Sequence, residues 1–76
     1  MIEANIFVEG ASVADVNNAV SLVLVLYDWS ADTIVDIAPK AGGVEMIVEF
    51  DTMLNYETFI YELEDAMGAS VSTFMY

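Results

Sequence analysis

Residues 32–50 read DTIVDIAPKAGGVEMIVEF and predict a β-hairpin. Within it, residues 44–50 alternate between two kinds of side chain, which is typical of a half-buried strand. One side of this strand is apolar, with Val44, Met46, Val48 and Phe50, and the other carries Glu45, Ile47 and Glu49. Residues 32–38 predict the preceding strand, and the proline and glycines of residues 39–43 supply the chemistry of a turn.

The chain before the hairpin predicts a strand and then a helix. Residues 2–8 alternate until Gly10, with Ile2, Ala4, Ile6 and Val8 inward and Glu3, Asn5, Phe7 and Glu9 outward. Ser12 and Asp15 then form a capping box. They precede a helix over about residues 13–28, whose apolar positions are Val13, Val16, Val20, Val23, Leu24 and Tyr27. Residues 20–27 are rich in β-branched side chains, so a buried strand is the alternative there. The cap and the polar Asn17, Asn18 and Ser21 favour the helix.

The chain after the hairpin predicts a second helix and a last strand. Asn55 is the expected N-cap of a helix over residues 56–67, and Gly68 is the expected stop. The apolar stripe of this helix consists of Tyr56, Phe59, Ile60, Leu63 and Met67. Residues 71–76 form the expected fourth strand.

The predicted element order is βαββαβ over a single domain, residues 1–76. This order resembles the ferredoxin-like superfold. The resemblance implies an α+β two-layer sandwich, with a four-stranded antiparallel sheet in the order 4-1-3-2 and two helices on one face. Many unrelated functions share the fold, so it says little about activity.

Composition excludes several functions. Thirteen acidic residues stand against one base, Lys40, for a net charge of −12, and the chain has no arginine, histidine or cysteine. We expect no direct binding to nucleic acid or anionic membranes, because both need Lys and Arg, whereas a basic protein surface would be attracted. No catalytic motif is present, so we expect no enzyme and no cofactor. Asp28, Asp32 and Asp36 lack the spacing of a calcium loop, so no metal site is expected.

The sequence shows no sign of export or membrane insertion. The N-terminal residues lack the positive start of a signal peptide, and the longest apolar run, residues 22–27, is too short to span a bilayer. The expected location is the cytoplasm.

Two groups of acids are candidate binding residues. RNA-recognition modules of this topology carry aromatic residues on the two central strands. Here the corresponding positions place Phe7 and Ile47 within a frame of Glu3, Glu9, Glu45 and Glu49, which suits a basic, partly apolar protein surface. The outward side of the second helix adds Glu57, Tyr61, Glu62, Glu64 and Asp65. Acids in its last two turns oppose the helix dipole by about 0.3–1 kcal/mol each, which selection for binding would explain and folding would not.

These observations predict a small acidic inhibitor that occupies the basic, nucleic-acid-binding surface of a partner protein. In size and charge the chain resembles small acidic phage-encoded inhibitors, including DNA mimics and anti-CRISPR proteins. The alternative is an oligomerisation or small-ligand regulatory module of the same fold, in which the acids serve solubility or adaptation to salt. A homodimer contact would then use the apolar residues that the first helix leaves over, which are Leu22, Val25, Leu26 and Trp29.

Overall fold

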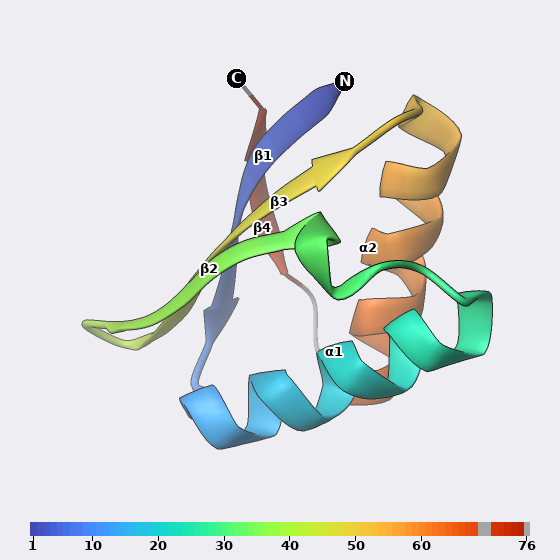
Figure 1. Ribbon diagram of the computed structural model, residues 1–76. Coiled ribbons are helices and arrows are strands. Elements are labelled where there is room, and N and C mark those ends of the chain that lie inside the picture. Colours follow the sequence, from blue (N-terminus) through green and yellow to red (C-terminus); the bar gives the residue numbers. More distant parts are fainter. Residues whose placement is uncertain (69–70, 76) are drawn as a thin grey trace.

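The computed structural model describes residues 1–68 and 71–75. Its elements are β1 (Ile2–Glu9), α1 (Val13–Tyr27), a 3-10 helix η1 (Ala31–Thr33), β2 (Ile34–Lys40), β3 (Gly43–Phe50), α2 (Met53–Met67) and β4 (Ser72–Met75). The strands form one antiparallel sheet in the order β2-β3-β1-β4, and the helices cover one face of it (Figure 1). The predicted ferredoxin-like arrangement is therefore confirmed, and the alternative of a strand at residues 20–27 is wrong.

The core lies between the sheet and the helix layer. Pairing of β1 with β3 sets Ala4 opposite Val48 and Ile6 opposite Met46, and all four side chains are fully buried. The helices cover them with Val16, Ala19, Val20 and Val23 from α1 and with Tyr56, Phe59 and Leu63 from α2. The predicted inward sides of both central strands and of α2 are thus confirmed.

The two ends of α1 explain how the chain turns back to the sheet. At the start, the Ser12 hydroxyl accepts a hydrogen bond of 3.1 Å from the Asp15 backbone N–H, as predicted. At the end, Asp28 adopts a left-handed conformation with φ of 55°, and its N–H donates to the Val25 carbonyl. The Trp29 N–H donates to the Leu24 carbonyl over 2.9 Å, which completes a Schellman motif.

This ending places Trp29 against the core. Its ring stacks on Tyr27 with centroids 4.8 Å apart and meets Phe50 edge-on at 5.3 Å. Trp29 is half-buried, whereas Tyr27, an expected inward residue, is 40% exposed. Trp29 therefore packs against the core, unlike Leu22, Val25 and Leu26 with which the sequence groups it, because the Schellman motif reverses the chain at Asp28.

Helix α2 begins one turn earlier than expected. The hydroxyl of Thr52 accepts a hydrogen bond of 3.1 Å from the Asn55 N–H, so Thr52 is the N-cap and Asn55 lies in the first turn. Threonine and asparagine both cap helices well, so residue type alone does not distinguish the two positions. Gly68, with φ of 69°, ends the helix as predicted.

The edge strands differ from the expected boundaries by about two residues. Asp32 belongs to η1, β2 continues to Lys40, and the hairpin turn consists only of Ala41 and Gly42. Pro39 pairs with Val44 inside β2, which an edge strand tolerates because one side of it needs no ladder hydrogen bonds. A register shift between Ile34 and Asp36 marks a β-bulge. The expected fourth strand, residues 71–76, is observed over Ser72–Met75, and residue 76 lies outside the described residues.

Among residues 1–68 and 71–75, no helix combines the length and apolar character that a membrane crossing requires.

Candidate protein-interaction surfaces

The face of the sheet away from the helices gathers the outward residues of both central strands. Glu3 pairs with Glu49, Asn5 with Ile47, and Phe7 with Glu45. The alternate pairs are buried beneath the helices, so these pairs point to the open side. The sequence thus predicted correctly that the two sets of residues share one face.

The edge strands add further residues to this face, and sequence reasoning missed the two that lie level with Asn5 and Ile47. Phe74 of β4 pairs with Asn5 and is 66% exposed, while Asp36 of β2 pairs with Ile47. Asn5 and Ile47 are themselves neighbours, so one row crosses the whole sheet from Phe74 to Asp36. We call the following set the sheet face: Glu3, Asn5, Phe7, Glu9, Asp36, Glu45, Ile47, Glu49 and Phe74.

The charge on the sheet face is negative but not uniform. Lys40 lies 3.1 Å from the Glu45 carboxylate, and their side chains are half-exposed and partly buried, respectively. An ion pair of this kind contributes at most about 1 kcal/mol, but it offsets the charge of Glu45. The acidic frame therefore consists of Glu3, Glu49, Glu9 and Asp36, grouped around the apolar residues of the face.

The centre of the sheet face contains an unpaired acceptor. Within the described residues, the Asn5 side-chain oxygen has no hydrogen-bond partner and is shielded from solvent. Its neighbours across the strands are Phe74 and Ile47. A buried acceptor without a donor destabilises the fold, so folding alone does not favour asparagine at this position.

The outer face of α2 is a separate surface. Leu54 and Tyr61 are 74% and 69% exposed, and Glu57 and Asp65 lie exposed beside them. We call these four residues the α2 outer face. The buried side of α2, with Tyr56, Phe59 and Leu63, faces the core, so these exposed residues lie on the other side of a helix that belongs to the helix layer (Figure 1). The structure therefore does not bring the two predicted groups of acids onto one surface.

Two of the predicted binding acids on α2 have contacts within the fold. The Glu64 carboxylate accepts a hydrogen bond of 3.1 Å from the Val71 N–H, just before β4. Glu62 lies beside the Tyr27 phenol, whose pKa is raised by burial, then by the Glu62 charge and hydrogen bond, and then by Tyr61. A contact within the fold thus accounts for the acid at position 64, which corrects the interpretation that folding gives no reason for it.

Helix α1 presents a third, apolar surface. Leu22, Val25 and Leu26 are 67%, 81% and 66% exposed. They lie three and four residues apart, so they form one stripe. We call these three residues the α1 outer face.

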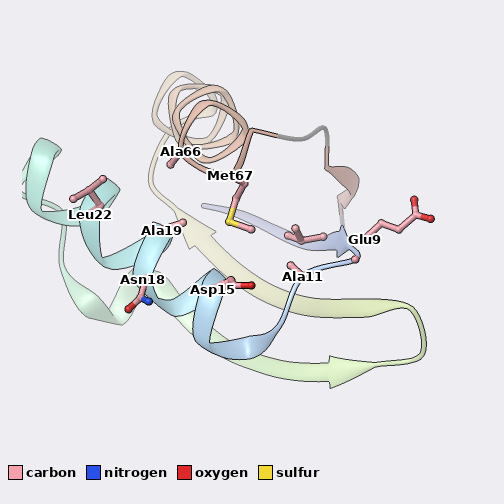
Figure 2. Close-up of a pocket in the computed structure, with 10 residues that line it drawn as sticks. Glu9, Ala11, Asp15, Asn18, Ala19, Leu22, Ala66 and Met67 are labelled. Atoms are coloured by element: carbon pink, nitrogen blue, oxygen red, sulfur yellow. The ribbon is translucent and has the colours of Figure 1, made fainter.

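A solvent-open hollow of about 610 Å³ separates the start of α1 from the end of α2. Figure 2 shows Asp15, Asn18, Ala19 and Leu22 of α1 on one side and Ala66 and Met67 of α2 on the other. Glu9 and Asp15 are its charged residues, and no basic side chain lines it. Within the described part of the chain, no three acidic side chains gather closely enough to hold a metal ion.

Comparisons with models of known protein families, with curated proteins and with solved structures found no match.

Proposed function

We propose that this chain is a small acidic protein that binds and blocks a basic surface of a partner protein, and that the sheet face makes the contact. One observation carries the proposal: Glu3 and Glu49 face each other across β1 and β3, next to a row that contains the partly buried Ile47 and the exposed Phe74. Like charges directly opposite in a sheet destabilise it. A cationic partner would remove that repulsion, so binding and folding make opposite demands on this pair.

The composition of the sheet face indicates the chemistry of the partner. Arginine binds carboxylates through several hydrogen bonds and also packs on aromatic rings, so it suits a site with Glu3, Glu49, Phe7 and Phe74. Aromatic residues are enriched in protein interfaces, and acids at the rim speed association by electrostatic steering. The expected partner surface carries Arg or Lys together with apolar or aromatic groups.

Surfaces that bind single-stranded nucleic acid combine these features, because basic side chains follow the phosphates and aromatic rings stack on the bases. We therefore propose that the partner is a nucleic-acid-binding protein and that the chain acts as a decoy. The likeness in size and charge to phage-encoded DNA mimics and anti-CRISPR proteins supports the same proposal. The net charge of −12 gives a field that a basic groove would capture quickly at low salt.

The test compares two double variants that each remove two negative charges. Glu3→Gln/Glu49→Gln changes the sheet face, and Glu57→Gln/Asp65→Asn changes the α2 outer face. A protein captured by the wild-type chain from cells that produce it is purified, and its labelled nucleic acid is displaced with each variant. We expect the sheet-face variant to displace it at least about tenfold less well, since charged hydrogen bonds are worth about 1.5–3 kcal/mol. The α2 variant should weaken displacement by less than about threefold, through its long-range charge alone.

Equal weakening by both variants would show that only net charge matters and would contradict a contact at the sheet face. A captured protein that keeps its nucleic acid at saturating wild-type chain would contradict the decoy function.

A further inference from the structure

The outer side of α1 is unlike the rest of this acidic chain. Residues 16–27 read VNNAVSLVLVLY and include no charged residue, although thirteen acids are spread over the 76 positions. The exposed side chains here are the α1 outer face together with the uncharged Asn17, Asn18, Ser21 and Tyr27. The nearest acids along the helix are Asp15 and Asp28, at its two ends.

We infer that a second copy of this chain covers the α1 outer face and forms a two-fold symmetric dimer. The charge distribution selects this occupant. A basic partner would find carboxylates only at the margins of the stripe, where Asp15 lines the same hollow as Leu22 and Asp28 lines the same hollow as Val25. An anionic membrane would be repelled by the net charge. A second copy carries the same charge of −12, and the uncharged stripe on α1 lets it approach without setting carboxylates opposite carboxylates.

An antiparallel pairing of the two helices fits these residues. The stripe is centred near residue 24, so a two-fold axis there sets each Asp28 opposite the uncharged middle of the other helix, where Ser21 lies. The two copies of Asp15 lie still farther apart. Each patch is self-complementary, as a two-fold interface requires. Three exposed aliphatic residues on each side make a small interface, so we expect a dissociation constant on the order of 0.1 mM.

This dimer leaves both sheet faces free. Helix α1 belongs to the layer on the opposite side of the sheet, so joining two copies through α1 turns both sheet faces outward. If the proposed function holds, the dimer is a bivalent inhibitor, able to hold two basic surfaces at once.

The dimer is tested by light scattering over a concentration series at about 0.15 M salt. The wild-type mass should rise from that of one chain toward that of two. The variant Val25→Gln/Leu26→Gln, which keeps the net charge and places good helix formers at exposed positions, should keep the mass of one chain. The matched control is Leu54→Gln/Tyr61→Gln on the α2 outer face, which should dimerise like the wild type. Circular dichroism verifies that both variants are folded.

A wild-type mass of one chain up to about 1 mM, ten times the expected constant, overturns the dimer. Association that persists in Val25→Gln/Leu26→Gln overturns the assignment to α1. A captured basic partner that is lost with this variant would show that another protein occupies the face, which also overturns the inference. The readout is independent of the decoy function, because Glu3→Gln/Glu49→Gln should still dimerise and Val25→Gln/Leu26→Gln should still displace nucleic acid.

Discussion

The backbone conformation of Asp28 places Trp29 against the core. A left-handed conformation is uncommon for residues other than glycine, although aspartate tolerates it better than most. The conformation lets Asp28 and Trp29 donate to the last carbonyls of α1, and it directs the indole back onto Tyr27 and Phe50. Sequence reasoning grouped Trp29 with the apolar residues that α1 leaves over, because helical periodicity gives no information beyond the end of the helix. Glycine would have marked this reversal, and aspartate does not.

We expect Tyr27 to make the stability of the protein depend on pH in the alkaline range. Its folded-state pKa is raised above the ordinary value of 10.0, first by burial and then by Glu62. A folded protein that holds this proton more tightly than the unfolded chain has its full stability below pH 10, and it loses stability as pH rises from there through the folded-state pKa. We expect Tyr27→Phe to show a smaller alkaline loss of unfolding free energy than the wild type, measured by urea unfolding at a series of pH values. Tyr61→Phe is the control and should keep most of the wild-type loss. Identical pH profiles for the wild type and Tyr27→Phe would contradict the assigned cause.

Glu64 illustrates a residue whose role no local pattern predicts. On a helical projection it is another acid near the unfavourable end of α2. Its carboxylate accepts from the N–H of Val71, seven residues later, which becomes visible only when the chain after α2 is placed. The prediction of Glu57, Tyr61 and Asp65 as exposed succeeded because their exposure follows from helical phase alone.

The N-cap of helix α2 is Thr52 in the structure, whereas the sequence predicts Asn55, and two alanine variants distinguish these positions. Thr52→Ala removes the oxygen that accepts from the Asn55 N–H, so we expect the unfolding free energy to fall by about 1 kcal/mol. Asn55→Ala keeps that hydrogen bond and improves helix propensity, so it should be neutral or stabilising by about 0.3 kcal/mol. Urea unfolding of both variants measures the difference. A larger loss of unfolding free energy in Asn55→Ala than in Thr52→Ala would show that Asn55 is the N-cap.

Periodicity predicted β1, β3 and α2 well because each buries one clearly apolar side. The edge strands were harder. Pro39 and Lys40 look like turn residues, yet an edge strand accommodates both, so β2 runs two residues further than expected. Sequence reasoning also missed Phe74 and Asp36 as members of the sheet face. Alternation along a strand does not show which face of the sheet a residue lies on until the register with β1 and β3 is known. That register depends on tertiary pairing and on a bulge that the sequence does not mark.

The whole molecule separates its surfaces by chemistry. The sheet face combines acids with aromatic and aliphatic side chains, and the α1 outer face is apolar and uncharged. They lie on opposite layers of the sandwich, so occupation of one does not block the other (Figure 1). Contacts on the two sides should therefore respond differently to ionic strength.

Added salt should shift three equilibria of this protein in different directions. Screening weakens repulsion among the charges that give −12, so the melting temperature should rise between low salt and about 0.15 M. The same screening lets two like-charged copies approach, so the dimer should tighten over this range. Capture of a basic partner depends on attraction and should weaken. Thermal melts, light scattering and nucleic-acid displacement at matched salt concentrations measure the three responses. A dimer that loosened with salt would be held by ion pairs, which the uncharged α1 outer face cannot provide, and the α1 interface would then be wrong.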